Sequence, residues 1–156
     1  MAGGAEAFPA ETGSVDAVAA FQAWHWFDSG VAAAECARVL RSGGLLSMGW
    51  HFRSEDVEWS RELSDIVEHH AHVPDDQEAP SVGPEYERSE TELFAYRMRQ
   101  SVQDLVRHAS TWSYVATHPD RDRMLDEVLA LGRTVADGEG MLEIPMQTRC
   151  YRFRRR

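Results

Sequence analysis

The chain has 156 residues, of which 43% are hydrophobic and 27% are charged, a size and composition typical of one globular domain. Its 26 acidic and 16 basic side chains give a formal charge of −10, which argues against a nucleic-acid partner because phosphate binding needs a basic surface. Every basic residue is arginine, so no catalytic lysine can be invoked. Two cysteines are too few for a disulfide scaffold or a thiolate zinc site, and no apolar run could span a membrane, so we expect no membrane association and a cytoplasmic protein.

The first half of the chain predicts a strand, a helix and a second strand. Val15–Phe21 is a short apolar run, as expected of a parallel strand covered on both faces. A helix capped by Asp28 or Ser29 is expected to run to Arg41, with Gly43-Gly44 ending it where a positive φ is needed and Cys36 in the core. The apolar stretch Leu45–Trp50 follows at once. This order predicts a βαβ unit with a parallel sheet and a right-handed crossover.

The second half predicts helices followed by a closing strand. The expected elements are a helix behind Ser54 with His70 on its apolar face, a strand at Leu93–Arg99, a helix capped by Ser101 and Asp104, a helix behind Pro119 and a strand at Met141–Phe153. Residues 73–90 break all periodicity and are expected to form a long loop, a functional lid or a loose insertion. Pro145 has no N–H to give a neighbour, so the last strand should be bent, bulged or near an edge there. The terminal arginines are expected to form a solvated tail.

Four strings in fixed order carry a resemblance to a known family. They are AEAFP (Ala5 to Pro9), VDAVAAFQAWHWFD (Val15 to Asp28), AECARVLRSGG (Ala34 to Gly44) and LLSMGWHFR (Leu45 to Arg53). Together they resemble the second half of a class I S-adenosylmethionine-dependent methyltransferase of the small-molecule, type 11-like kind. The resemblance implies an α/β fold with a partial Rossmann-like methyltransferase sheet, in which parallel strands precede an antiparallel C-terminal strand pair and helices flank the sheet. It implies a single, incomplete domain over residues 1–156.

The resemblance also implies the site residues of a methyl transfer from S-adenosylmethionine to a small-molecule acceptor. Ala5 and Glu6 match the segment that lines the adenine, and Gln22 and Ala23 match the strand end beside the methionine part of the cofactor. His25 and Trp26 match a pair that faces the substrate, and Trp50 and His51 match a pair that closes the next strand. The sequence departs from the family at Gly4, where an acid often contacts the adenine, and at His51, where the family has asparagine.

Physical reasoning agrees with these placements, because ligands of open α/β sheets lie outside the carboxyl ends of the parallel strands. Tryptophan rings there can exclude water and face the sulfonium charge, although at least one of Trp24, Trp26 and Trp50 is expected to be core. His25 can act as the catalytic base that takes a proton from an acceptor hydroxyl, or it can make a structural hydrogen bond.

The family's glycine-rich loop, which holds the methionine carboxylate and the ribose, has no counterpart in this sequence. No G-x-G-x-x-G follows a predicted strand, and Gly138-x-Gly140 comes too late in the chain. We therefore expect an N-terminally truncated member that lacks about 70–90 residues of cofactor-binding structure and binds S-adenosylmethionine incompletely. The strand at Val15–Phe21 would then expose an unpaired edge, which favours self-association or a partner chain.

Two other readings of the sequence stay open. His69 and His72, spaced i and i+3 and followed by Asp75 and Asp76, could share a metal on a helix, although we expect a polar helix end and no metal. The second reading is a non-catalytic accessory or interaction subunit that keeps half of the methyltransferase fold and docks through its exposed strand and acidic loop.

Overall fold

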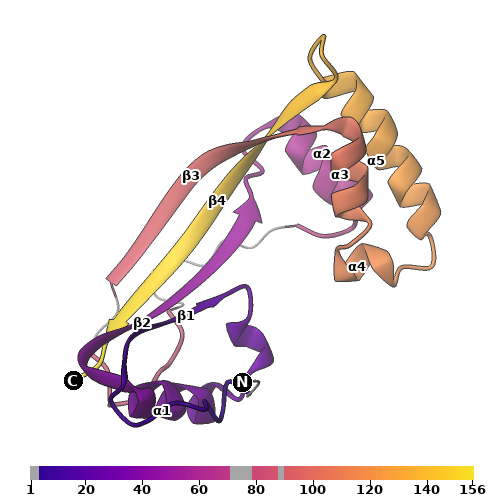
Figure 1. The fold of residues 1–156 in the computed structure, drawn as a ribbon. Helices are drawn as coiled ribbons and strands as arrows, with labels where there is room; N and C mark the ends of the chain where they lie inside the picture. Colours follow the sequence, from indigo (N-terminus) through magenta and orange to yellow (C-terminus); the bar gives the residue numbers. More distant parts are fainter. Residues whose placement is uncertain (1–3, 71–78, 88–89) are drawn as a thin grey trace. The chain divides into compact units, whose positions relative to one another are not determined.

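The computed structural model describes residues 4–70, 79–87 and 90–156 (Figure 1). The strands are β1 (Val15–Phe21), β2 (Leu40–Arg53), β3 (Glu90–Ser101) and β4 (Met141–Arg154). The helices are α1 (Ser29–Val39), α2 (Glu58–Ile66), α3 (Val102–Ala109), α4 (Ser113–Ala116) and α5 (Arg121–Val135), with a single 3-10 turn, η1, at Trp24–Trp26. Within the described ranges, every helix is too short or too polar to cross a bilayer.

The strands form a sheet in the order β1-β2-β4-β3. β1 and β2 are parallel, with Val18 opposite Leu46. β2 and β4 are antiparallel, because the Gly43 N–H donates to the Arg155 carbonyl and the Arg155 N–H donates to the Gly44 carbonyl, each at 2.9 Å. The predicted α/β sheet, in which parallel strands precede an antiparallel C-terminal pair, is confirmed.

The chain divides into two compact units, each with its own core. Unit 1 comprises Met1–His51, Val73–Phe94 and Thr148–Arg156, and unit 2 comprises Phe52–His72 and Ala95–Gln147. The prediction of one domain over residues 1–156 stays a prediction. Of the predicted loop at 73–90, residues 73–78 and 88–89 lie outside the described residues, whereas Val82 and Tyr86 are buried in the unit 1 core.

Unit 1 is built on helix α1, which Figure 1 draws beside β1 and β2. Asp28 caps the helix as predicted, because its side chain accepts the Val31 N–H at 3.2 Å. Small residues on one face of the helix let it approach the sheet, and Cys36 among them is only 2% exposed. Burial raises the pKa of the Cys36 thiol to about 11, so the thiol stays neutral, as expected of a core residue.

The glycine pair does not end helix α1, which corrects the prediction. The helix ends at Val39, and Leu40 is already extended. Gly43, with φ +74°, and Gly44 lie inside β2, where the pairing of β1 with β2 shifts register. The positive φ therefore serves a bulge in the ladder.

β1 is less covered than its apolar sequence predicts. Ala20 is the one buried residue of the strand, and the Phe21 side chain is 57% exposed. The expected cover on both faces is wrong, because Ala20 packs in one core with residues of α1 whereas Phe21, on the opposite face, stays exposed. β1 is also an edge strand, since among the described strands it pairs with β2 alone.

Unit 2 packs helices α2, α3 and α5 around Leu63, Leu105 and Val128. The predicted capping box of α3 is confirmed, since the Asp104 N–H donates to Ser101 Oγ at 3.1 Å and the Ser101 hydroxyl donates to the Asp104 carboxylate at 2.8 Å. Helix α2 ends at Ile66, and Glu68 has a φ of +51°. The chain therefore leaves the helix before His70, and the predicted place of His70 on the apolar helix face is wrong.

The C-terminal strand differs from its prediction in two ways. β4 lies inside the sheet, between β2 and β3, so the edge is excluded for Pro145, and the predicted alternatives of a bend or a bulge there stay predictions; the Pro145 carbonyl accepts the Ser54 N–H at 2.8 Å. The terminal arginines are not a solvated tail either. Arg154 donates to the Gly43 carbonyl at 3.0 Å, and Arg156 donates to the Tyr86 carbonyl at 3.0 Å, so both side chains bind the chain end to neighbouring backbone.

Candidate functional site

A cavity of about 540 Å³ opens in unit 1 beside the carboxyl end of β1, and we call it the β1 cavity. Its walls come from the segment before β1, from β1 itself, from the η1 turn and from α1. The lining residues are Gly4, Ala5, Phe8, Val18, Ala19, Ala20, Phe21, Ala23, Trp24, Phe27 and Cys36. All are apolar or small, so the cavity suits an aromatic or aliphatic group rather than a charged one.

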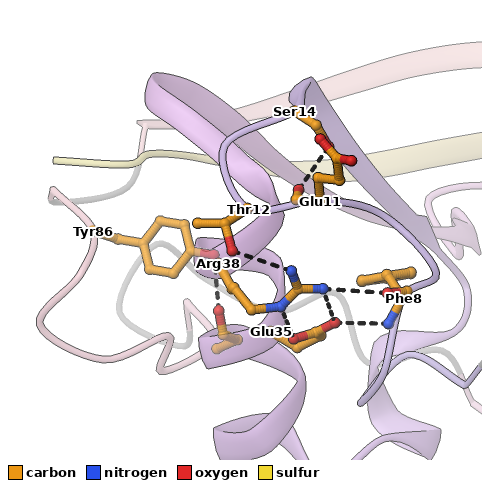
Figure 2. A network of polar contacts seen from close by, with 8 residues as sticks. Phe8, Glu11, Thr12, Ser14, Glu35, Arg38 and Tyr86 are labelled. Carbon is orange, nitrogen blue, oxygen red and sulfur yellow. Dashed lines mark hydrogen bonds and ion pairs between the residues drawn. The ribbon is translucent and has the colours of Figure 1, made fainter.

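A polar network joins Phe8, which lines the β1 cavity, to helix α1 (Figure 2). The Glu35 carboxylate on α1 accepts the Phe8 N–H at 2.7 Å and two hydrogen bonds from the Arg38 guanidinium, also at 2.7 Å. Arg38 in turn donates to the Phe8 carbonyl at 3.2 Å and to the Thr12 hydroxyl at 3.4 Å. This network ties the irregular segment that carries Ala5 and Phe8 to a regular helix.

The Glu35→Gln substitution is expected to remove an acid-dependent part of the stability of unit 1. The hydrogen bonds from Arg38, together with that from the Phe8 N–H, lower the pKa of Glu35 from 4.5 to about 2. A carboxyl whose pKa is lower in the folded state stabilises the fold above pH 4.5 and loses that contribution as the pH falls toward 2. The unfolding temperature of the wild type should therefore fall more steeply than that of Glu35→Gln between pH 4.5 and 2. An equal dependence of the two unfolding temperatures on pH would contradict the network.

The structure brings two of the predicted cofactor residues together in the β1 cavity. Ala5 and Ala23 line it from different segments. Glu6 lies outside the lining, and its carboxylate accepts the Asp28 N–H at 3.3 Å. Gln22 also lies outside the lining and holds the turn after β1: it adopts a φ of +52°, and its N–H donates to the Gly49 carbonyl at 2.9 Å.

The predicted substrate residues lie in unit 1: His25 and Trp26 in the η1 turn after β1, and Trp50 and His51 within β2. The Trp50 indole N–H donates to His25 Nδ1 at 3.2 Å, and the Trp50 ring contacts Tyr151 edge to face at 5.9 Å. Trp26 is 76% exposed and stacks at a tilt on His25, with 4.9 Å between the ring centroids. His51 contributes its carbonyl, which accepts from the Gln22 side chain at 2.9 Å. One hydrogen bond and one ring contact therefore join His25, Trp26 and Trp50.

The hydrogen bond from Trp50 limits what His25 can do. An Nδ1 atom that accepts the indole N–H carries no proton, so neutral His25 has its proton on Nε2. In this arrangement His25 offers an Nε2–H donor to a bound acceptor, whereas a base acting through Nε2 requires the other tautomer. The geometry favours a hydrogen-bonding role for His25, and its catalytic role stays a prediction.

Sequence reasoning named Trp24 as a candidate wall or core residue, but it missed Phe8 and Phe27 in the lining of the β1 cavity. Trp24 is 4% exposed, and its indole N–H is buried without a hydrogen-bond partner in the described structure. Phe27 contacts the Trp24 ring edge to face at 5.9 Å and shares the lining with Phe8. The string QAWHWF contains both tryptophans, but periodicity cannot tell which of them turns inward in a 3-10 turn.

The lining of the β1 cavity fits one end of S-adenosylmethionine. An adenine ring suits apolar walls such as these. A carboxylate, an ammonium and ribose hydroxyls need several polar partners, and the lining offers no charged side chain for them. The described residues therefore fit the adenine and do not fit the amino-acid end.

The alternative metal site gains no support from the part of the chain that is described. Within residues 4–70, 79–87 and 90–156, no three His, Cys, Asp or Glu side chains come close enough to hold a metal ion. His70 instead pairs with Glu55 and Asp65, each at 3.1 Å, and His69 stacks on Tyr114. The remaining predicted ligands, His72, Asp75 and Asp76, lie outside the described residues.

Comparisons with known proteins agree with the sheet and with the four strings. The family model of a methyltransferase domain matches residues 1–48. An uncharacterized methyltransferase of Mycobacterium tuberculosis is 38% identical over 97% of this chain, and one of Schizosaccharomyces pombe is 32% identical over 81% of it. The chain spans 63% of the mycobacterial protein and 54% of the yeast protein.

A solved structure shares the fold. A proposed type II methyltransferase from Anaeromyxobacter dehalogenans superposes with a TM-score of 0.67 and 22% identity, covering 97% of this chain and 68% of that one. The methyltransferase resemblance carried by the four strings is confirmed: in sequence the chain is similar to methyltransferases, and it shares the fold of a solved one.

Proposed function

We propose that this chain is part of an enzyme that transfers a methyl group from S-adenosylmethionine to a small-molecule acceptor, and that the β1 cavity receives the adenine of the donor. The observation that carries the proposal is the meeting of Ala5 and Ala23 in one apolar cavity. These are two of the residues that the family resemblance assigns to the cofactor. Their neighbour Trp24 adds an unpartnered indole N–H, which a ring nitrogen can accept.

We further propose that residues beyond this chain complete the donor site. The chain spans less than two thirds of its mycobacterial relative, and the amino-acid end of the donor finds no polar partners in the lining of the β1 cavity. His25 and Trp50 would then face the acceptor, with His25 Nε2–H as a donor to its oxygen or nitrogen. By itself the chain binds S-adenosylmethionine weakly and is impaired as a catalyst.

The Ala23→Leu substitution tests the place of the adenine. A leucine at this position fills part of the β1 cavity, so adenosine binding should weaken by about tenfold or more. Ala17→Leu is the control, because Ala17 lies on β1 outside the cavity lining. Titration followed by nuclear magnetic resonance should show adenosine shifting the Trp24 indole signal in wild type and Ala17→Leu. Equal adenosine affinity in all three proteins would place the adenine elsewhere.

A non-catalytic role is the second candidate, and the exposed edge of β1 favours it. An edge strand with an exposed Phe21 is a template for another strand, so the chain could serve as an accessory subunit of a partner protein or of a second copy. Light scattering of the purified chain measures its association: a dimer would support the non-catalytic role through the β1 edge. A folded monomer without affinity for adenosine would argue against both proposed functions.

A further inference from the structure

Arg53 is a buried arginine at the end of β2, in unit 2, that the proposed function does not use. The residue is only 9% exposed. Its guanidinium carbon lies 4.4 Å from the centre of the Trp112 ring, a cation–π distance. The Trp112 side chain is itself partly exposed.

The polar partners of Arg53 are all neutral. Nη1 donates to the Tyr114 hydroxyl, and Nη2 donates to Ser64 Oγ and to the His69 carbonyl, each at 3.3 Å. These distances lie beyond the usual range for such bonds and well beyond that of a charge-assisted one. Nε is buried with no partner, and among the described residues no aspartate or glutamate accepts from the guanidinium.

A buried cation that donates no hydrogen bond to a carboxylate among the described residues is costly to the fold. Neutral oxygens and an aromatic face offset only part of the lost hydration of a guanidinium, and replacing a buried charge by an apolar side chain often stabilises a protein. The aromatic rings around Arg53 are also arranged as a cover: His69 stacks on Tyr114 with 4.0 Å between centroids and 17° between planes. Desolvation and the positive charges of Arg53 and His70 lower the pKa of His69, against the opposing effect of the Glu55 carboxylate.

We propose that Arg53 binds the carboxylate of a small anionic ligand, held against the rings of Trp112 and Tyr114. A carboxylate oxygen that replaces the Tyr114 hydroxyl at Nη1 makes a shorter, charge-assisted bond and neutralises the cation. The site supplies one arginine, which matches the single charge of a carboxylate; a phosphate dianion is usually held by several cations or backbone N–H groups. The site lies within unit 2 and does not depend on the β1 cavity.

The first test uses succinate as the probe on the whole chain, with succinamide as the neutral control and inorganic phosphate as the other anion. Succinate should shift the Arg53 Nε–H and Trp112 indole signals in nuclear magnetic resonance spectra and raise the unfolding midpoint. Succinamide should do neither, and phosphate should bind at least about tenfold more weakly. Absence of a succinate shift, an equal shift with succinamide, or tighter binding of phosphate would overturn the proposal.

The second test is the Arg53→Met substitution, with Arg133→Met as its control, since Arg133 is an exposed arginine on α5 and its loss changes the net charge equally. Without ligand, Arg53→Met should unfold at the same temperature as the wild type or higher, and it should lose the effect of succinate. Arg133→Met should keep that effect. A cation that serves only the fold would instead make Arg53→Met less stable, and unchanged succinate binding in Arg53→Met would also refute the proposal. The adenosine affinity of Arg53→Met should equal that of the wild type. This titration therefore tests the proposed function independently of the carboxylate site.

Discussion

Replacing Leu46 by alanine is expected to lower the free energy of unfolding of unit 1 by about 3 kcal/mol. Leu46 is fully buried at the centre of β2, opposite Val18 of β1, and packs in the core with the small face of α1. The truncation removes buried methyl groups and leaves a cavity that a helix and a strand held by backbone hydrogen bonds cannot close. Denaturant unfolding followed by circular dichroism measures the change.

Leu93→Ala serves as the control for this prediction. Leu93 belongs to the same unit, but it is 39% exposed on β3, so its truncation should change the free energy by no more than about 0.5 kcal/mol. Similar losses in the two variants would show that the two leucines are buried alike, contrary to the fold described above.

Gly44→Ala is expected to destabilise the pairing of β1 with β2, by about 1–3 kcal/mol. A Cβ atom at Gly44 would lie 2.8 Å from the Arg41 carbonyl oxygen and 3.1 Å from the Asp16 carbonyl oxygen. Both contacts are to backbone, which cannot move aside as a flexible side chain can. Since β1 forms one wall of the β1 cavity, hydrogen exchange should show faster opening of β1, and adenosine affinity should fall with it.

Gly138→Ala is the control, because a Cβ atom there meets no heavy atom within 4 Å. This variant should be neutral or slightly more stable, since alanine restricts the unfolded chain more than glycine does. Unchanged β1 exchange in Gly44→Ala would contradict the tight approach of β1 and β2 at the bulge.

Local signals explain why much of the fold could be predicted from the sequence. The Asp28 cap and the Ser101–Asp104 capping box act over a few residues, so the local sequence predicts where α1 and α3 begin. The order of strand, helix and strand in under forty residues likewise allows little besides a parallel pair.

The errors arise where tertiary structure decides. The Gly43-Gly44 pair can end a helix or form a bulge, and only the pairing of β1 with β2 selects the bulge. An apolar run such as Val15–Phe21 predicts a covered strand, but cover depends on neighbours that the run does not encode. Proline in β4 predicted a bend, a bulge or an edge, and the strand order excludes the edge, since Pro145 lies in an interior strand and its carbonyl accepts the Ser54 N–H.

The candidate site was predictable only as far as the family resemblance reaches. Ala5 and Ala23, assigned by that resemblance, meet in one cavity, whereas the inward turn of Trp24 and the hydrogen bond from Trp50 to His25 depend on the conformation of η1. The surroundings of Arg53 come from three distant segments of unit 2, so no spacing rule could have found them.

The most direct test of the proposed function compares two ligands on this chain by isothermal titration calorimetry: S-adenosylmethionine and adenosine. If the β1 cavity holds the adenine and these residues leave the amino-acid end without partners, the two ligands should bind with dissociation constants within about tenfold of each other, and neither should reach the micromolar range, about −8 kcal/mol. Micromolar binding of S-adenosylmethionine, with adenosine far weaker, would show that this chain grips the amino-acid end by itself and would contradict the account.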